Sequence, residues 1–217
     1  MSLLSYLFPR EVAHSSTKYN RDIRVIEERG KKSLLINGSR QSGQYIEMLW
    51  KKTCNRFGIH DRLLFKNILV LGVGGGSVIH LLSRLYPGAR ITAVDIDPEI
   101  IEIGKEFFGL DVLPNLRFVE ADAKEYLEYI AKGRSDRVDF IVVDVFVGST
   151  IPAFVESGKF LLSVRQAVND RGVVVINFLR ELAYLEKSER LKKNLSKIFS
   201  SVEDFSLYNN RFFFLVP

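Results

Sequence analysis

The sequence predicts an α/β fold in which strands and helices alternate to build a doubly wound, mostly parallel sheet. From Lys66 onward, short apolar runs alternate with segments of helical periodicity, a pattern typical of a parallel sheet with helices on both faces. The first apolar run, residues 68–71, leads directly into a glycine-rich segment at residues 72–77. The 217 residues, 47% of them hydrophobic, fit one domain with a small appendage.

The N-terminal part predicts a small β-hairpin. Residues 22–28 and 32–36 have the composition of short strands, and Gly30 between them supplies the left-handed residue of a tight turn. Asn37-Gly38 marks another turn beyond the second strand. We therefore expect a hairpin region over residues 1–43.

The main domain is expected over residues 44–217, beginning with a helix at residues 44–57. Apolar or small residues of this helix recur near one face: Tyr45, Met48, Leu49 and Thr53. The strands that follow are predicted at residues 67–71, 90–95, 116–120, 140–144 and 173–178. The helices between them are predicted at residues 77–86, 98–107, 123–131 and 154–168, with Pro98 in a first turn that tolerates proline.

The regular alternation of predicted strands and helices ends in the C-terminal part. Asp170-Arg171-Gly172 is predicted as the turn before the fifth strand, and Leu191, Leu195 and Ile198 space as one helix face. Residues 202–207 and 211–216 then predict two strands joined across Asn209-Asn210. An antiparallel C-terminal strand would close a seven-stranded sheet, whereas a dinucleotide-binding dehydrogenase continues with parallel units.

Composition excludes several classes of protein. No apolar run approaches the ~20 residues of a membrane span, and the start of the chain, residues 1–10, lacks the basic start of a signal peptide. A single cysteine, Cys54, excludes an internal disulfide, and three scattered histidines exclude the usual zinc spacings. We expect a cytoplasmic protein without a metal. We also expect His80 to be a surface or packing residue, Cys54 to be inert, and Phe212-Phe213-Phe214 to form an edge or core strand.

The net charge of +5 comes from a basic excess ahead of the glycine-rich segment. Nucleic acid would be one acidic partner for such a surface. A solvated lysine-rich surface is favoured, because no aromatic-basic recognition pattern accompanies the charge.

Polar groups gather where the predicted strands end. Glycines allow the backbone to turn tightly after the first strand, and the following helix N-terminus offers unpaired N–H groups. Asp95 ends the second strand, where it is placed to accept hydrogen bonds from ribose hydroxyls. Asp122-Ala123 and Asp144 follow the third and fourth strands, although Asp122 also suits a helix N-cap. The ordered set predicts a nucleoside-binding crevice.

The chain resembles the spermidine synthase group within the Rossmann-like S-adenosylmethionine-dependent methyltransferases. The resemblance lies in residues 69–77, 94–98, 120–126 and 138–144. The resemblance implies that Gly72, Gly74, Gly75 and Gly76 line the sulfonium cofactor, and that Asp95 binds its ribose. Ile96 would pack on the adenine, and Asp122 and Ala123 would bind its edge. Gln41 and Tyr45 would lie over the reactive end, Asp144 would also contact the cofactor, and Tyr45 and Asp144 are the catalytic candidates.

Departures from the family decide between reactions. Where this chain has Gly75, aminopropyltransferases carry an aspartate that binds the amine of decarboxylated S-adenosylmethionine. Where it has Val147, they carry an aspartate that acts as the catalytic base. Ile46 replaces the polar residue usual after the tyrosine. A cationic amine needs carboxylates to bind and deprotonate it, whereas a helix N-terminus favours the carboxylate of intact S-adenosylmethionine. We therefore expect a methyltransferase that uses S-adenosylmethionine.

Two alternatives remain open. One is a divergent aminopropyltransferase that uses decarboxylated S-adenosylmethionine, with Glu156 or Glu47 replacing the lost acids. The other is a non-catalytic nucleoside-binding protein. A dehydrogenase using NAD is disfavoured, because Ser77 stands where its fingerprint has the last glycine. The expected partner is a small-molecule or protein methyl acceptor, with neither membrane nor nucleic acid, and a homodimer through the N-terminal hairpin is a further expectation.

Overall fold

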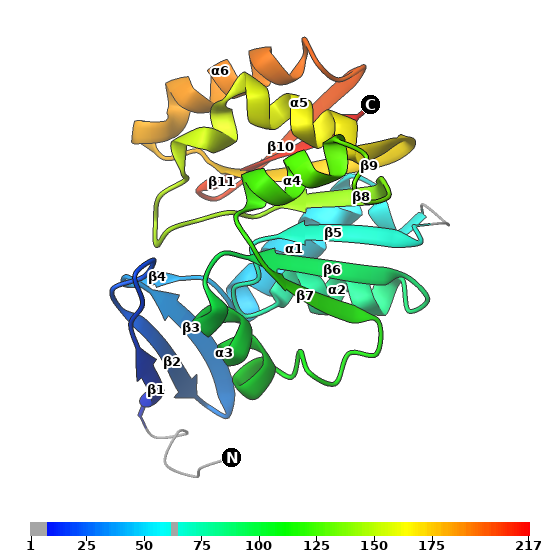
Figure 1. Cartoon of the computed structure of the whole chain (residues 1–217). Coiled ribbons are helices and arrows are strands. Elements are labelled where there is room, and N and C mark those ends of the chain that lie inside the picture. The colour runs from blue at the N-terminus through cyan, green and yellow to red at the C-terminus, as the bar shows by residue number, and fades with distance from the viewer. Residues whose placement is uncertain (1–7, 62–64) are drawn as a thin grey trace.

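The computed structural model describes residues 8–61 and 65–217, which form two sheets (Figure 1). Most of the segment at residues 1–10, considered above for a signal peptide, lies outside the described residues. The larger sheet has seven strands in the order β10-β11-β9-β8-β5-β6-β7, and the smaller has four in the order β1-β2-β3-β4.

The central sheet is parallel in its middle and antiparallel at its C-terminal edge. Its strands are β5 (Asn67–Leu71), β6 (Arg90–Asp95), β7 (Leu116–Glu120), β8 (Val138–Val143), β9 (Val168–Leu179), β10 (Ser201–Leu207) and β11 (Asn210–Val216). Strands β7, β6, β5, β8 and β9 pair in parallel, while β11 pairs antiparallel with both β9 and β10. This confirms the predicted Rossmann-like fold with its antiparallel C-terminal strands.

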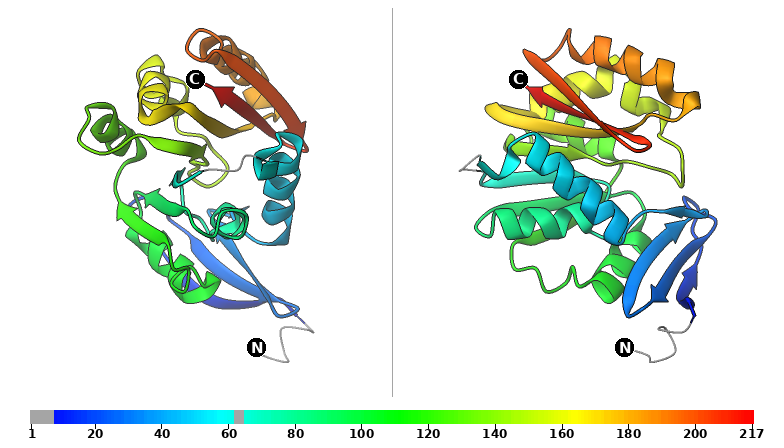
Figure 2. Two further views of the ribbon diagram at one scale, coloured as in Figure 1. Left: turned by 90° about the vertical axis from the view of Figure 1, so that its right-hand side faces the viewer. Right: turned by 180° about the vertical axis from the view of Figure 1, so that it is seen from behind.

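Helices cover both faces of this sheet, because the central strands carry apolar residues toward both faces. On one face lie α1 (Gln44–Arg56), α2 (Ser77–Leu85) and α3 (Pro98–Phe108), which pack with Ile68 and Val70. On the other lie α4 (Ala123–Ala131), α5 (Gly158–Ala167) and α6 (Leu185–Leu195), which pack with Leu69 and Leu71. Figure 2 shows these two layers from the side and from behind. Short 3₁₀ turns complete the set: η2 (Ile59–Asp61), η3 (Ala153–Glu156) and η4 (Leu182–Tyr184).

The N-terminal region is a four-stranded antiparallel sheet rather than the two-stranded hairpin expected. Its strands are β1 (Arg10–Ser15), β2 (Ile23–Glu28), β3 (Lys31–Ile36) and β4 (Ser39–Arg40). Two-residue turns connect β2 to β3 and β3 to β4, and all four turn residues have positive φ, which is the requirement of a type I′ hairpin. Strand β1 was missed because it is an edge strand without an alternating buried face.

The helix predicted at residues 154–168 is interrupted. The Ser157 hydroxyl accepts a hydrogen bond from the Phe160 amide at 3.3 Å and caps α5, so the preceding residues form the separate turn η3. The turn predicted at Asp170-Arg171-Gly172 lies inside β9 instead. Gly172 is required there because a Cβ would lie 2.6 Å from the Asp139 carbonyl oxygen on β8.

Two further details differ from the sequence predictions. The turn between β10 and β11 is formed by Tyr208-Asn209 rather than Asn209-Asn210, since Asn210 already pairs with Leu207. Helix α1 buries Trp50 and Cys54 with Leu49 and Thr53, while Tyr45 stays 41% exposed.

Other predictions are confirmed. Phe212, Phe213 and Phe214 are buried in β11, and the His80 ring packs with its Nε2 atom 2.7 Å from the Phe108 carbonyl oxygen. Burial raises the pKa of the Cys54 thiol to about 12, which keeps it protonated and unreactive. No helix in residues 8–61 or 65–217 is both long and apolar enough to cross a membrane.

Candidate functional site

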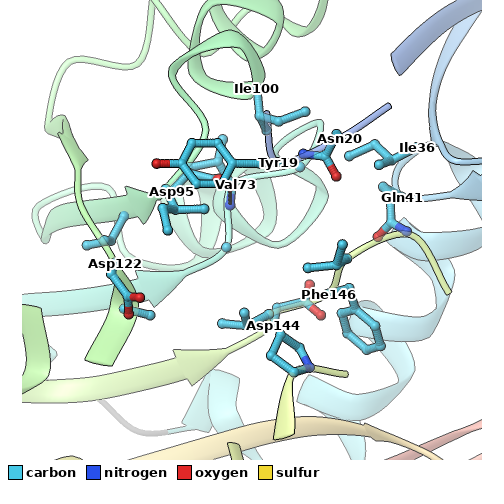
Figure 3. Close-up of a pocket in the computed structure, with 18 of the residues that line it drawn as sticks. Tyr19, Asn20, Ile36, Gln41, Val73, Asp95, Ile100, Asp122, Asp144 and Phe146 are labelled. Carbon is cyan, nitrogen blue, oxygen red and sulfur yellow. Dashed lines mark hydrogen bonds between the residues drawn. The ribbon is translucent and has the colours of Figure 1, made fainter. Parts of the chain in front are cut away.

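A cavity of about 320 Å³ opens at the carboxyl ends of the parallel strands. Asp95 at the end of β6, and Asp122 and Asp144 just after β7 and β8, surround it (Figure 3). Tyr19, Asn20 and Gln41 come to the same cavity from the N-terminal sheet. A cavity therefore lies at the edge of the sheet where the crevice was predicted, and the N-terminal sheet supplies one of its walls.

The glycine loop after β5 lines one side of the cavity. Gly72 has a φ of 92° and lies so close to the Asp144 backbone that a Cβ would overlap the carbonyl oxygen. Gly74, with a φ of 49°, approaches the backbone of Gln41. Only glycine fits at position 72, and the absence of side chains at Gly72 and Gly74 leaves the loop backbone open to a ligand.

Two glycines of the loop have a different position from the one expected. Among the described residues around the cavity, Gly75 and Gly76 are not part of the lining. Gly75 faces Ser42 and Phe108, and a Cβ there would lie 2.5 Å from the Ser42 Cβ. Gly76 caps α2 in a left-handed conformation and packs against Leu110. Both glycines serve close packing behind the loop.

Asp95 organises the turns on either side of it. Its Oδ2 accepts a hydrogen bond from the Val73 amide at 2.9 Å, and its Oδ1 accepts one from the Asp97 amide at 3.0 Å. Burial raises the pKa of the Asp95 carboxyl to about 6, although the Val73 and Asp97 amides act in the opposite direction. Each carboxylate oxygen keeps a second lone pair, so hydroxyl groups of a ligand can still donate to Asp95.

The loop between β1 and β2 is fastened to the start of α3. The Asp97 carboxylate caps α3 and also accepts hydrogen bonds from the Thr17 hydroxyl at 2.6 Å and the Asn20 amide at 2.8 Å. These bonds hold Tyr19 and Asn20 at the cavity, where sequence reasoning did not place them.

The residues after β7 combine a structural role with a position in the site. The Asp122 Oδ1 accepts a hydrogen bond from the Lys124 amide at 2.8 Å and caps α4, and the Lys124 ammonium lies 3.3 Å from Oδ2. Both Asp122 and Ala123 line the cavity. Ile96 also lines it and remains 38% exposed, so it offers an apolar surface to a flat ring.

A second cavity of about 250 Å³ adjoins the first. Gln41, Ile46, Asp144 and Phe146 line both cavities and form the wall that they share. The Gln41 amide nitrogen donates to the Gly148 carbonyl oxygen at 2.6 Å, which ties the N-terminal sheet to the loop after β8. Tyr45 lines the second cavity, with its ring 5.7 Å from that of Tyr208. Burial raises the pKa of Tyr45, with a smaller contribution from Tyr208.

Asp144 is the acid at the junction of the two cavities. Its Oδ1 accepts a hydrogen bond from the Asn177 amide at 2.8 Å, and its Oδ2 accepts one from the Trp50 indole at 3.2 Å. Burial raises the pKa of the carboxyl to about 6, while these two hydrogen bonds lower it. Near neutral pH Asp144 is therefore an ionised group that readily takes up a proton.

The acids nominated as replacements do not reach this junction. Glu156 pairs with Arg190 at 3.2 Å, and of the described acidic residues the second cavity is lined by Asp144 and Glu181, not by Glu156 or Glu47. Val147 lines the first cavity and is 44% exposed in a turn that it closes with Thr150.

Sequence reasoning also missed Trp50 and Asn177. Asn177 had a visible signal, because it is a lone polar residue in the apolar run of β9. Trp50 is the single tryptophan of the chain, but nothing local indicates that its indole nitrogen faces Asp144.

A sequence model described as the spermine/spermidine synthase domain matches residues 47–211. The chain belongs to this family. The matched region starts within α1 and ends in β11, so it contains the glycine loop, the three strand-end aspartates and Asn177.

Relatives named for two kinds of activity match part of this chain. The chain is 35% identical over 112 residues to a polyamine aminopropyltransferase of Vibrio vulnificus, covering 52% of this chain and 37% of that protein. It is 29% identical over 151 residues to an eEF1A lysine and N-terminal methyltransferase homolog of Drosophila melanogaster, covering 65% of this chain and 22% of that protein. The chain therefore spans well under half the length of these relatives.

The fold of human methyltransferase-like protein 13, solved in complex with SAH, is also similar. The two structures superpose with a TM-score of 0.62 and 26% identity, over 70% of this chain and 72% of that one. The family and the similar structures show a spermidine-synthase-like fold, and the named relatives include both a methyltransferase homolog and an aminopropyltransferase.

Proposed function

We propose that this protein transfers the methyl group of S-adenosylmethionine to an amine. The observation that carries the proposal is the packing at Gly75, where aminopropyltransferases hold the cofactor's amine with an aspartate. Ser42 is buried against Gly75 and leaves no space for a side chain at that position. The site thus keeps the groups that suit a nucleoside and lacks the one that favours the decarboxylated cofactor.

The residues present fit S-adenosylmethionine. Asp95 retains lone pairs for the ribose hydroxyls, and Ile96 offers an apolar surface for the adenine. The Ala123 amide lies in the first turn of α4, where backbone N–H groups have no helical partner. The first turn of α2, Ser77-Val78-Ile79, carries no acidic residue, so its N-terminus favours the methionine carboxylate.

The second cavity is the proposed entrance for the acceptor. When bound, the cofactor supplies an electrophilic methyl group, and a carbon–nitrogen bond forms as the carbon–sulfur bond breaks and sulfur keeps the electron pair. Asp144 lies where the cavities meet and accepts the proton that the acceptor nitrogen loses. Gln41 and Phe146 border the same junction and limit the directions of approach.

An amine acceptor is supported by the named activities of the relatives. The Drosophila protein is an eEF1A lysine and N-terminal methyltransferase homolog, and lysine side chains and N-termini are amines. The Vibrio protein is a polyamine aminopropyltransferase, so its acceptor is also an amine. Asp144 is suited to such an acceptor, because a carboxylate attracts an ammonium group and then receives its proton.

Aminopropyl transfer is the second candidate, and one observation favours it. Glu181 lines the second cavity together with Asp144, and its Oε1 accepts a hydrogen bond from the Asn209 amide at 3.2 Å. Two carboxylates in one cavity suit a diamine. The Gly75 packing argues against the decarboxylated cofactor that this reaction needs.

Mass spectrometry of the products decides between the two candidates. The protein is incubated with S-adenosylmethionine or its decarboxylated form, together with putrescine, butylamine and lysine-containing peptides. We expect a gain of one methyl group from S-adenosylmethionine and at most trace aminopropylation. Efficient aminopropylation of putrescine would overturn the proposal, and the absence of any product together with tight cofactor binding would favour a non-catalytic nucleoside-binding protein.

A further inference from the structure

Two side chains hold the Asp144 carboxylate, and a third supports one of them. Asn177 on β9 donates to its Oδ1 at 2.8 Å, and Trp50 on α1 donates to its Oδ2 at 3.2 Å. Behind Asn177, the Asn210 amide on β11 donates to the Asn177 oxygen at 2.9 Å. The hydrogen bonds therefore run in one direction, from the C-terminal hairpin through Asn177 to the acid.

This arrangement fixes the orientation of the Asn177 amide. Its oxygen is occupied by Asn210, so its nitrogen must face Asp144. Asn177 is 7% exposed and its strand neighbours Ile176 and Phe178 are fully buried. A polar side chain in such a strand is costly unless its hydrogen bonds are satisfied, and here both ends of the amide are used to hold the acid.

We propose that Asn177 is a positioning residue, which, with Asn210 behind it and Trp50 opposite, orients Asp144 toward the group transferred between the two cavities. The inference rests on the proposed function, because it assigns the reacting atoms to the junction of the cavities. It makes the C-terminal hairpin a part of the active site.

The orientation has an electrostatic consequence. Both hydrogen bonds favour the ionised form of Asp144, so removing the Asn177 donor raises the pKa of the carboxyl further above its present value of about 6. The charged or titratable groups that share a cavity with Asp144 are Tyr19, Arg40, Tyr45, Asp95, Asp122, Lys124 and Glu181. None of them hydrogen-bonds to Asp144 in the described part of the chain. Their effect on the pKa of Asp144 should therefore be the same in all variants.

The test uses two ligands, S-adenosylhomocysteine and sinefungin, which carries an amine where S-adenosylmethionine carries its methyl group. A well-oriented Asp144 carboxylate should make sinefungin bind more tightly, and the preference should fade below about pH 6. We expect Asn177→Leu to reduce this preference about tenfold, the scale of a lost hydrogen bond to a charged group. Asn210→Ala should reduce it less.

Asn169→Leu is the matched control. Its amide donates to the Asp139 carboxylate at 2.8 Å on the same two strands, β8 and β9, away from both cavities. The control should keep the preference and its pH dependence. An unchanged preference in Asn177→Leu and Asn210→Ala, with S-adenosylhomocysteine still bound, would overturn the positioning role.

A second measurement separates this inference from the proposed function. Carbon-13 NMR of the side-chain carboxyls follows the titration of Asp144 without any ligand. The pKa of Asp144 should rise in Asn177→Leu and in Asn210→Ala but not in Asn169→Leu. If the native protein binds neither ligand, the proposed function fails, and an Asp144 titration that is identical in all variants would refute the positioning role as well. Asn210 is only half-buried, at the first position of β11, so its variant remains informative if Asn177→Leu does not fold.

Discussion

Replacing Gly75 by alanine tests the packing that separates this chain from aminopropyltransferases. The added Cβ would lie 2.5 Å from the Ser42 Cβ and 3.3 Å from the Phe108 ring. Ser42 is 1% exposed, and its hydroxyl accepts a hydrogen bond from the Leu34 amide at 3.0 Å, so it cannot move away freely. Gly75 does not have a left-handed backbone, and the cost is therefore steric. Overpacking of this kind destabilises a fold by about 1–3 kcal/mol.

A double-mutant cycle isolates that contact. Ser42→Gly costs about 1–3 kcal/mol by itself, because the buried Leu34 amide loses its acceptor. In the Ser42→Gly background, Gly75→Ala no longer meets the Ser42 side chain and should cost at least about 1 kcal/mol less. Urea unfolding followed by circular dichroism, with equal m-values, gives the four free energies of unfolding. An equal cost of Gly75→Ala in both backgrounds would refute the argument.

Two further predictions concern the buried acids. Asp95→Ala should weaken S-adenosylmethionine binding by about 1.5–3 kcal/mol, and unchanged affinity in calorimetry, with the fold intact, would remove Asp95 from the site. The second prediction concerns the pH dependence of stability. Folding raises the pKa values of Asp95 and Asp144 from 3.8 to about 6, so the folded state binds more protons than the unfolded state between these pH values. Lowering the pH from 7 to 5 should therefore raise the contribution of each acid to the free energy of unfolding by about 1 kcal/mol. Urea titrations of the native protein and of Asp144→Asn at both pH values check this, and an equal pH dependence of the two proteins would contradict it.

Local signals predicted the central fold well. Apolar runs, a glycine turn and Pro98 mark β5, α2 and α3 within their own sequence. Errors arose where neighbours decide the structure: β1 is an edge strand with little buried surface, and Gly172 is needed for an approach to β8 rather than for a turn.

In the candidate site, too, local signals predicted some residues, whereas tertiary contacts decide the position of others. Asp95, Asp122 and Asp144 could be predicted, because the ends of parallel strands meet at one edge of the sheet. Tyr19 and Asn20 could not, since their place depends on bonds to a residue far along the chain, Asp97. The position of Gly75 also depends on tertiary packing, against Ser42.

Calorimetric comparison of S-adenosylmethionine with its decarboxylated form tests the central claim most directly. The α2 N-terminus favours the carboxylate that only the intact cofactor carries, and Gly75 offers no partner for the amine. The account predicts that the native protein binds S-adenosylmethionine more tightly, by about tenfold, which corresponds to about 1.4 kcal/mol. Tighter binding of the decarboxylated form by the same factor would contradict it.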